Sequence, residues 1–319
     1  MNIEKLVNEI IAGRRLSRND EVDFLESASL VELTNGADRL REHFIGNHVD
    51  LCTIIAGKSG NCGENCKFCA QSAHSSTGCN VYGLLDYDEI YAEALSNEKE
   101  GVNKFAIVIS GRQPSDEDFN KLIEIYKKLK CNLKISLCAS LGFLTQEQFD
   151  ALKSVGVTNY HNNIETSRGY FEKICTTHTF EDKVENIKRA KKAGLNVCSG
   201  GIIGMGESFS DRIDMAFDLA ELEIKSIPIN VLLPIKGTPL ESLDTLTEEE
   251  ILRTIAAFRF INPEADIRMA AGRLLIKENG RRVFESGISS TITGNMLTTT
   301  GATIESDIKM LKSMKRDIC

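Results

Sequence analysis

A regular alternation of apolar runs and amphipathic segments constrains the fold of this chain most strongly. The apolar runs have the length and composition of buried parallel strands. They cover residues 51–56, 104–110, 133–139, 158–164, 196–201, 226–232, 266–270 and 288–292. Segments of helical periodicity follow them at residues 86–98, 115–128, 145–154, 179–193, 208–222, 247–261, 273–286 and 303–314. Eight strands, each followed by a helix, predict an α/β fold of the (β/α)8 TIM-barrel type. A doubly wound open sheet is the alternative, because the last strand is weak.

Three further helical patterns, at residues 3–12, 19–27 and 30–45, precede the first strand. We therefore expect an N-terminal helical extension over residues 1–48 and a barrel domain over residues 49–319. The formal net charge of −8 offers no electrostatic surface for nucleic acid. No apolar run reaches membrane-spanning length, and the charged first helix does not resemble a signal peptide. These features predict a cytoplasmic protein with neither nucleic acid nor membrane as a partner.

Three of the ten cysteines, Cys62, Cys66 and Cys69, stand in a glycine-broken loop after the first predicted strand. In a (β/α)8 barrel, the loops at the carboxyl ends of the strands form the active site. Three thiolates at this spacing can hold three corners of an iron–sulfur cube and leave one iron open, which indicates a cluster that binds and cleaves a small molecule. A structural zinc site is the alternative, but zinc usually takes four protein ligands. The nearest fourth candidate, Cys79, stands ten residues beyond Cys69.

The spacing Cys-x3-Cys-x2-Cys, with Phe68 before the last cysteine, resembles the radical S-adenosylmethionine (SAM) superfamily. The resemblance implies that the three thiolates hold a 4Fe–4S cluster whose open iron binds SAM. Electron transfer into SAM then releases a 5′-deoxyadenosyl radical. Within this superfamily the chain is similar to the biotin synthase family in four segments. They are residues 55–71, 160–167, 197–207, and 227–230 with 236–239.

This resemblance implies a sulfurtransferase that converts dethiobiotin to biotin. Carried over by position, the residues expected to bind SAM are Phe68, Asn163, Glu165, Gly200, Ile202 and Gly204. Asn163 and Asn230 are expected to bracket dethiobiotin. For each asparagine, the alternative is a strand-end residue that satisfies its own turn. The family also implies a flavodoxin- or ferredoxin-type electron donor and a homodimer. His178 stands where the family commonly has arginine, and it receives no role.

The family is further known for a second, 2Fe–2S cluster held by three cysteines and an arginine. Cys138, Cys198 and Arg268 match three of these ligands, but Ala106 stands at the position of the remaining cysteine. Interior side chains of a barrel stack in layers from alternate strands, so Cys52 on the first strand is expected to complete the layer. We therefore predict an auxiliary cluster held by Cys52, Cys138 and Cys198, with Arg268 beside it. It is either a 2Fe–2S cluster or a larger 4Fe-type cluster with an extra sulfide.

Several alternatives stay open from the sequence. Cys52 can be a simple buried apolar side chain, and Cys79 is a second candidate ligand. Ser226 and Ser290 fall where hydroxyls can donate hydrogen bonds to cluster sulfides. Three other classes of protein are compatible with the cysteine loop: a different radical enzyme on the same scaffold, an electron-transfer iron–sulfur protein, and a zinc-stabilised interaction protein.

Overall fold

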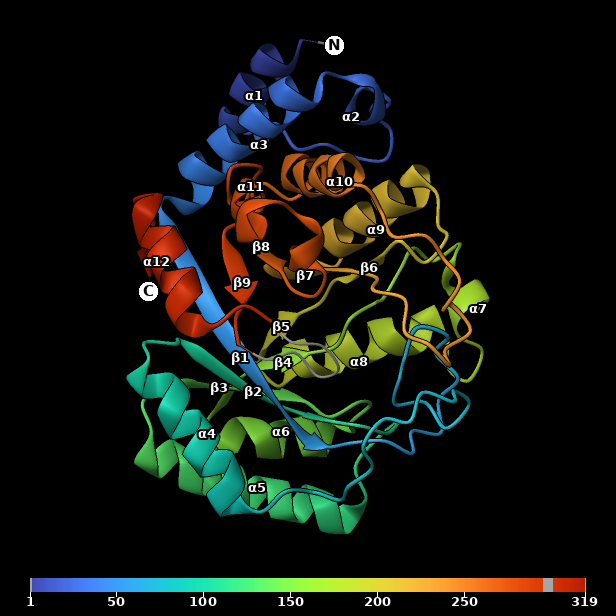
Figure 1. The fold of residues 1–319 in the computed structure, drawn as a ribbon, viewed down its shortest axis with the longest axis vertical. Helices are drawn as coiled ribbons and strands as arrows, with labels where there is room; N and C mark the ends of the chain where they lie inside the picture. Colours follow the sequence, from blue (N-terminus) through green and yellow to red (C-terminus); the bar gives the residue numbers. More distant parts are fainter. Residues whose placement is uncertain (1, 295–300, 319) are drawn as a thin grey trace.

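A closed barrel of parallel strands forms the centre of the computed structural model, which describes residues 2–294 and 301–318 (Figure 1). The strand order is β1-β2-β3-β4-β5-β7-β8-β9, with β6 beside β7, and β9 pairs back with β1. The strands are β1 (His48–Lys58), β2 (Lys104–Ile109), β3 (Ser136–Ser140), β4 (Val157–His161), β5 (Asn196–Cys198), β6 (Gly201–Ile203), β7 (Ser226–Val231), β8 (Asp266–Met269), β9 (Ser290–Ile292) and β10 (Asp317–Ile318). This closure confirms the predicted (β/α)8 barrel and excludes the open sheet.

Helices cover the outside of the barrel (Figure 1). They are α4 (Tyr87–Lys99), α5 (Asp116–Asn132), α6 (Gln146–Ser154), α7 (Phe171–Ile174), α8 (Phe180–Lys192), α9 (Phe209–Glu221), α10 (Glu248–Ile261), α11 (Arg281–Phe284) and α12 (Ile304–Ser313). Capping boxes begin five of them, because the N-cap side chain and the third helical residue satisfy each other's backbone N–H groups. The N-caps are Asp86, Thr145, Thr179, Ser208 and Thr247.

The first three helices, α1 (Ile3–Ile11), α2 (Phe24–Ser27) and α3 (Leu30–Ile45), lie together at one end of the molecule (Figure 1). Helix α3 packs against both α1 and α10. A Cβ atom at Gly36 would lie 2.9 Å from the ring of Phe260, so glycine permits this close approach of α3 to α10. No helix in the described part of the chain is long and apolar enough to cross a membrane.

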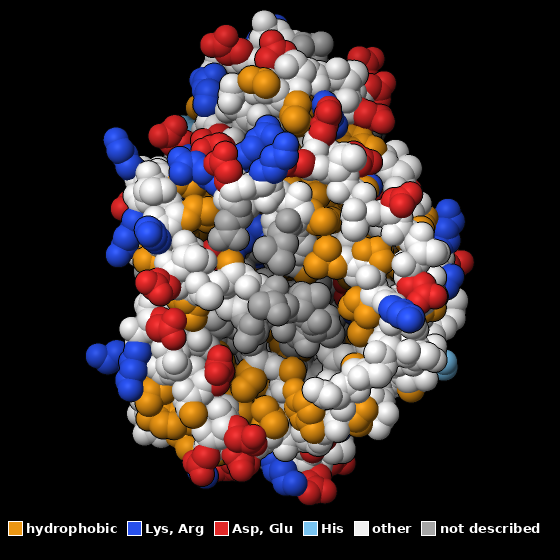
Figure 2. All heavy atoms as spheres, viewed as in Figure 1, with side chains coloured by type: hydrophobic (Ala, Val, Ile, Leu, Met, Phe, Trp, Pro, Cys, Tyr) orange, Lys and Arg blue, Asp and Glu red, His pale blue; other side chains and the backbone are white. Residues whose placement is uncertain are grey.

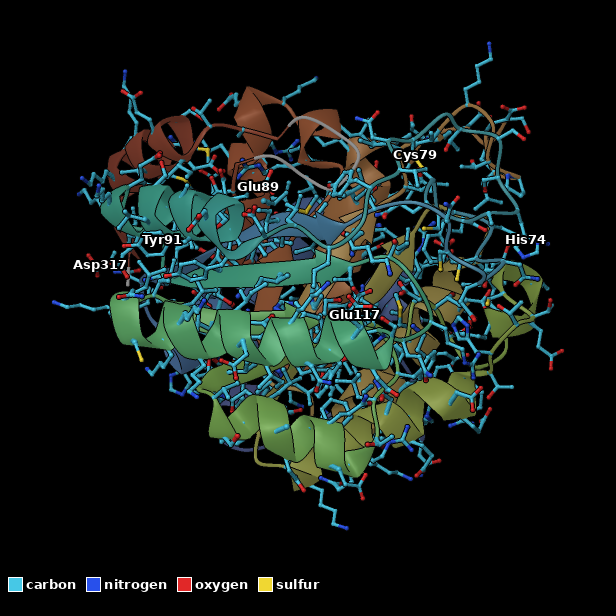
Figure 3. The ribbon with its side chains drawn as sticks, turned by 90° about the horizontal axis from the view of Figure 1, so that it is seen from below. His74, Cys79, Glu89, Tyr91, Glu117 and Asp317 are labelled. Atoms are coloured by element: carbon cyan, nitrogen blue, oxygen red, sulfur yellow. The ribbon has the colours of Figure 1, made fainter. Side chains whose placement is uncertain are left out.

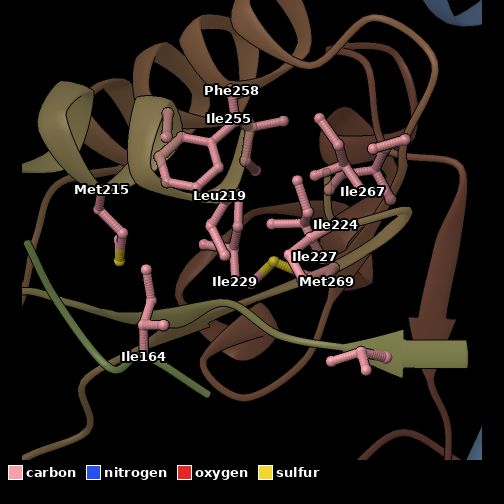
Figure 4. Close-up of a cluster of buried hydrophobic side chains, with 14 of the residues drawn as sticks. Ile164, Met215, Leu219, Ile224, Ile227, Ile229, Ile255, Phe258, Ile267 and Met269 are labelled. Atoms are coloured by element: carbon pink, nitrogen blue, oxygen red, sulfur yellow. The ribbon is translucent and has the colours of Figure 1, made fainter. Parts of the chain in front are cut away.

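The main hydrophobic core lies between the outer faces of the strands and the helices. Figure 4 shows part of it, where side chains of β7 and β8 such as Ile227 and Met269 meet Leu219 of α9 and Phe258 of α10. On the face drawn in Figure 2, charged side chains lie mainly around the rim and hydrophobic side chains gather nearer the centre.

Three local predictions need correction, and one short strand was not predicted. The helix expected at residues 273–286 is broken into two short 3-10 turns and α11, because Gly272 and Gly280 adopt left-handed φ values of 88° and 80°. The helix expected at residues 19–27 shortens to α2, because the Asp20 carboxylate accepts hydrogen bonds from Ser17 and closes a turn. The fifth strand divides into β5 and β6 at Gly200. The short strand β10, which pairs with the start of β1, was not predicted.

Candidate active site

The loop between β1 and α4 carries Cys62, Cys66 and Cys69 at the carboxyl end of the barrel. Backbone hydrogen bonds fix its shape: the Cys62 N–H donates to the Gln71 carbonyl (3.0 Å), and the Ala73 N–H donates to the Cys62 carbonyl (2.7 Å). All three thiols are half-buried. Burial raises the pKa of Cys69 to about 11. The loop therefore presents three cysteines on a fixed backbone, and a bound metal would be needed to keep this buried thiolate charged.

Figure 3 shows which end of the molecule this loop occupies. His74 and Cys79 of the loop lie at one end, and Asp317 of β10 lies at the other. The register agrees with the view, because β10 pairs with the first residues of β1, whereas the loop follows the last. The cysteine loop thus lies on the face where a parallel barrel carries its active site.

A second group of side chains surrounds Cys66. Its Sγ atom lies 3.7 Å from Sγ of Cys175, which in turn lies 3.4 Å from Nδ1 and 3.8 Å from Nε2 of His178. Nδ1 of His178 contacts the Glu64 carboxylate. Cys66, Cys175 and His178 each offer a ligand atom, and these atoms all lie within 4.8 Å of one another. Within residues 2–294 and 301–318, this is the only such group of three or more Cys, His, Asp or Glu residues. The hydrogen bond with Cys66, assisted by His178, lowers the pKa of Cys175 to about 3, and the same bond raises the pKa of Cys66.

Sequence reasoning left Cys175 and His178 without a role. The available signal was the Cys-x2-His spacing of the two residues. The loop cysteines stand far earlier in the chain, so the sequence did not link the pair to them. By contrast, the ligand atoms of Cys62, Cys66 and Cys69 do not all lie within 4.8 Å of one another in the described structure. Thiolates that bind different irons of one cluster lie farther apart than ligands of a single ion, so this wider spacing suits a cluster better than a zinc ion.

Apart from Phe68 in the cysteine loop, the predicted SAM-binding residues gather around the ends of β4, β5 and β6. The Asn163 side-chain oxygen accepts a hydrogen bond from the Gly200 N–H (3.2 Å). Glu165 has a left-handed φ of 70°, a conformation that non-glycine residues rarely adopt and that often marks a functional site. Burial raises the pKa of the Glu165 carboxyl, although Nζ of Lys183, 3.8 Å away, opposes this shift. A Cβ atom at Gly200 would lie 1.9 Å from the Pro228 carbonyl oxygen, so this position requires glycine.

An apolar cavity of about 230 Å³ adjoins this region at the carboxyl end of the barrel. Phe68, Cys69, Ile202 and Asn230 are among its lining residues. The Asn230 amide is fixed from both sides: its nitrogen donates to the Gly201 carbonyl (3.3 Å), and its oxygen accepts from the Ala271 N–H (3.2 Å). The structure therefore brings the cysteine loop and one predicted substrate residue to a single cavity.

Backbone contacts fix the positions of two further residues predicted to bind SAM, Ile202 and Gly204. The Glu165 carbonyl accepts a hydrogen bond from the Ile202 N–H (2.8 Å), so the two predicted SAM residues adjoin. The Gly204 N–H donates to the Glu207 carboxylate (2.7 Å). The Gly204 N–H is therefore occupied within its own loop. Gly204 can contribute to SAM binding only by leaving space where another residue would have a side chain.

Cys52, Cys138 and Cys198 lie buried inside the barrel. Cys52 and Cys138 pack together with Ala106 in a small cluster separate from the main core. The hydrogen bond with Cys138 lowers the pKa of Cys52 to about 6 and raises the pKa of Cys138.

Cys198 pairs in register with His161 of β4, a neighbour that sequence analysis did not use. Although burial disfavours its thiolate, His161 and Arg268 lower the pKa of Cys198. Two of these thiols are therefore poised to bind metal as thiolates.

Arg268 crosses the same layer and is 2% exposed. Its Nη2 donates to the Asp50 carboxylate (2.8 Å) and its Nη1 to the Thr291 carbonyl (3.1 Å), but its buried Nε has no hydrogen-bond partner. The buried hydroxyl of Ser290, which pairs with Arg268 in register, also lacks a partner. The Ser226 hydroxyl donates to Sγ of Cys198 (3.2 Å).

Buried donors without partners are costly, and they indicate a missing acceptor. Three thiols beside such donors fit an iron–sulfur cluster, because its sulfides accept hydrogen bonds. Ala106 offers no ligand at the position where the resemblance implies a cysteine. Cys52 packs in the same small cluster, although its register partner on β2 is Lys104. Cys79 lies instead in the half-buried cysteine loop, outside this layer (Figure 3).

Comparisons with known proteins agree with this geometry. Residues 58–219 match the Radical SAM superfamily, and residues 228–316 match the Biotin and Thiamin Synthesis associated domain. A protein of Alkaliphilus metalliredigens named biotin synthase is 54% identical over 314 residues, which cover 98% of this chain and 99% of the relative. A biotin synthase of Clostridium beijerinckii is 53% identical over 312 residues, with 98% and 99% coverage.

Solved structures are similar in fold. The crystal structure of methylornithine synthase (PylB) matches with a TM-score of 0.84 and 22% identity, covering 98% of this chain and 97% of that one. The structure of HydG, a maturase of the [FeFe]-hydrogenase, matches with a TM-score of 0.81 and 17% identity, covering 99% of this chain and 75% of that one.

Proposed function

Because this chain belongs to the biotin synthase family of the radical SAM superfamily, we propose that it inserts sulfur into dethiobiotin to form biotin. The observation that carries this proposal is identity above 50% to named biotin synthases along 98% of the chain. The position of Cys62, Cys66 and Cys69 at the carboxyl end of a closed barrel supports it. When bound, a 4Fe–4S cluster supplies reductive cleavage of SAM to a 5′-deoxyadenosyl radical, and an auxiliary iron–sulfur cluster supplies sulfur.

In this proposal, the cysteine loop holds the first cluster and Glu165 binds SAM. A carboxylate is a suitable acceptor for the two neighbouring hydroxyls of the SAM ribose. Glu165 is held in its left-handed conformation by the hydrogen bonds that its backbone makes to Gly200 and Ile202. Two neighbouring residues complete the SAM pocket. Asn163 is held in place by the Gly200 N–H, and Gly200 has no side chain that would block a ligand.

Dethiobiotin occupies the apolar cavity beside Asn230, where Phe68 and Ile202, the residues expected to bind SAM, also line the wall. An apolar lining suits a substrate whose reacting carbons carry only hydrogen, because burying such groups away from water is favourable. The Asn230 amide has one further N–H and one further lone pair beyond its two backbone contacts, so it can bind both groups of a ureido ring. Asn163 binds the ring from the other side.

Cys52, Cys138 and Cys198 hold the auxiliary cluster, with Arg268 beside it. The three buried thiols, the unpartnered Nε of Arg268 and the unpartnered hydroxyl of Ser290 support this assignment. A ligand set that draws on strands one, three and five favours a 4Fe-type cluster with an extra sulfide over the 2Fe–2S form. Arg268 and Ser290 then orient the cluster by donating hydrogen bonds to its sulfides.

Other parts of the proposal carry over from the sequence. A flavodoxin- or ferredoxin-type electron donor and a homodimer rest on resemblance to the family. A cytoplasmic location and the division into a helical extension (residues 1–48) and a barrel domain (residues 49–319) rest on the sequence patterns.

Anaerobic turnover tests the function directly. The full chain is reconstituted with iron and sulfide and then given SAM, dethiobiotin, and reduced flavodoxin. We expect both biotin and 5′-deoxyadenosine by mass spectrometry, and neither product from a Cys62→Ala variant. Deoxyadenosine without biotin from the intact protein would instead indicate a different radical enzyme on this scaffold.

A further inference from the structure

A second cavity, of about 320 Å³, lies at the end of the barrel opposite the cysteine loop. Its lining includes the first residues of four strands, which mark the amino end of the barrel. They are Lys104 of β2, Asn196 of β5, Ser226 of β7 and Asp266 of β8. The apolar cavity at the carboxyl end is lined instead by Phe68, Cys69 and residues beyond the ends of β6 and β7. The barrel is thus hollowed from both ends.

The inner end of this second cavity is made by residues of the auxiliary site. Cys198, His161, Asn159 and Arg268 all line it. Of the three buried thiols, Cys198 lines the cavity itself, and Asn159, which donates a hydrogen bond to Sγ of Cys138 (3.5 Å), separates the cavity from a second. Arg268, which also lines the cavity, is the residue whose buried Nε has no hydrogen-bond partner. A molecule that enters here therefore meets the auxiliary ligands without passing SAM or dethiobiotin.

The lining of this cavity is polar and highly charged. Four cationic side chains line it, Lys104, Lys191, Lys225 and Arg268, together with two carboxylates, Glu223 and Asp266. Lys191 lies 3.7 Å from Glu223, Lys225 lies 3.5 Å from Glu264, and Lys104 and Arg268 share the single carboxylate of Asp50. Each lining cation thus faces a carboxylate, so a small anion can enter, and reversing the charge of two of these lysines would repel it.

We infer that this cavity is the site through which hydrosulfide enters to replace the sulfur that each biotin removes. The inference rests on the proposed function, because only a sulfur-inserting enzyme must refill its cluster. Hydrosulfide is a small anion, and a polar cavity of about 320 Å³ admits it together with water. On joining the cluster as sulfide it releases one proton to solvent through the same opening. Sulfur has the same oxidation state in both forms, so no oxidant or reductant is needed.

The position of the cavity explains why a second opening is useful. During turnover the carboxyl end of the barrel is occupied by SAM and dethiobiotin, so a sulfur donor cannot share that route. An opening at the amino end allows sulfide to reach the auxiliary site while the substrate end stays closed to water. The lining lysines Lys191 and Lys225 lie at the exposed outer part of this route, far along the chain from the cysteine loop.

Isotope exchange on the holoenzyme tests the inference. The reconstituted full chain performs one turnover, is desalted, and is then incubated anaerobically with ³⁵S-labelled sodium sulfide without SAM or dethiobiotin. The rate at which ³⁵S enters the acid-labile sulfide of the protein is measured, followed by ³⁵S-biotin in a second turnover. The variants are Lys191→Glu/Lys225→Glu, which reverses two lining charges, and Asn196→Trp, which fills the opening. Lys192→Glu, an exposed lysine outside the lining, is the matched control.

We expect the double lysine variant to take up label about tenfold more slowly at low sulfide and to recover at high sulfide. Asn196→Trp should be slow at every sulfide concentration, while Lys192→Glu matches the wild type. Biotin from the first turnover should be unchanged in all three. Wild-type labelling rates in both lining variants would overturn the inference. If Asn196→Trp does not fold, the result of the double lysine variant is sufficient to decide. Absence of first-turnover biotin in the wild type would refute the proposed function instead.

Discussion

Cys52 is the single residue on which the proposed auxiliary site depends. It is fully buried beside Cys138 and Ala106, and its pKa is lowered to about 6 by the Cys138 contact. We predict that Cys52→Ala loses the iron and sulfide of the auxiliary cluster, retains the SAM cluster, and cleaves SAM without forming biotin. Biotin formation should fall at least about a hundredfold, because a removed metal ligand has no substitute at Ala106. Iron and sulfide analysis with Mössbauer spectroscopy measures the cluster content.

Cys131→Ala is a suitable control for this experiment, because Cys131 is exposed on α5 and lies in neither site. It should leave both cluster contents and the biotin yield unchanged. Full biotin formation by Cys52→Ala would show that Cys52 is only a buried apolar side chain. An iron content in the wild type that matches a 2Fe–2S auxiliary cluster would refute the larger form.

Cys66, Cys175 and His178 predict a further behaviour of the cluster-free protein. A tetrahedral ion with metal–sulfur bonds of about 2.3 Å holds two sulfurs about 3.8 Å apart, and the observed Sγ–Sγ distance is 3.7 Å. Glu64 contacts Nδ1 of His178, which leaves Nε2, 3.8 Å from Sγ of Cys175, as the nitrogen that can bind the ion. Carboxylates commonly hold the second nitrogen of a metal-bound histidine in this way.

We therefore predict that the cluster-free chain binds one Co²⁺ ion with thiolate-to-cobalt absorption. Cys175→Ala and His178→Ala should each weaken this binding at least about tenfold. Titration followed by visible absorption measures the affinity. Cys79→Ala is the control, because Cys79 lies outside this group of three ligands. An unchanged spectrum in Cys175→Ala would contradict the prediction. This site and the cluster share Cys66, so reconstitution with iron and sulfide should displace the cobalt.

At the scale of elements, most of the barrel could be predicted from the sequence. Apolar runs and capping residues are local signals, so β1, β2 and the helices that begin at Thr145, Thr179 and Thr247 were recognised. The division of the fifth strand and the short β10 depend on contacts between distant segments, which no local pattern encodes.

The candidate site divides in the same way. The loop cysteines follow one another closely in sequence and are recognised by their spacing. Cys175 and His178 reach Cys66 only because α7 folds against the cysteine loop, where the Lys67 N–H donates to the Ile174 carbonyl (2.9 Å). The cavity at the amino end needs the closed barrel, so sequence reasoning could not find it.

The break between β5 and β6 is an element-scale feature with a testable origin. At Gly200 a side chain would collide with the Pro228 carbonyl, which cannot move without distorting β7. We predict that Gly200→Ala lowers the free energy of unfolding by at least about 2 kcal/mol. It should also weaken SAM binding, because the backbone shift that relieves the collision would move the N–H that donates to Asn163. Urea unfolding and equilibrium dialysis measure the two effects.

Gly169→Ala is the control, because a Cβ atom at Gly169 has no neighbour within 4 Å, and it should change neither stability nor SAM binding. Equal stability of the two variants would contradict this account.

At the scale of the whole molecule, a buried ion pair ties the C-terminal helix to the closing strands of the barrel. Nη2 of Arg273, just after β8, donates to both carboxylate oxygens of Asp307 on α12, at 2.7 and 2.8 Å. Asp307 is fully buried, so removing its partner leaves an uncompensated charge in the core. We predict that Arg273→Met lowers the free energy of unfolding by about 3–5 kcal/mol, whereas Arg273→Met/Asp307→Leu recovers most of that loss.

Urea unfolding of the cluster-free protein, followed by circular dichroism, measures both variants. Arg281→Met is the control, because Arg281 pairs with Glu285 in an exposed position and should cost less than about 1 kcal/mol. The comparison separates two ways in which α12 can close the barrel. If the charge pair itself stabilises the closure, the double variant will be as unstable as the single one, and our account is wrong. If the pair only avoids a buried lone charge, the double variant will be stable, and apolar packing of α12 against the barrel is what holds β9 beside β1.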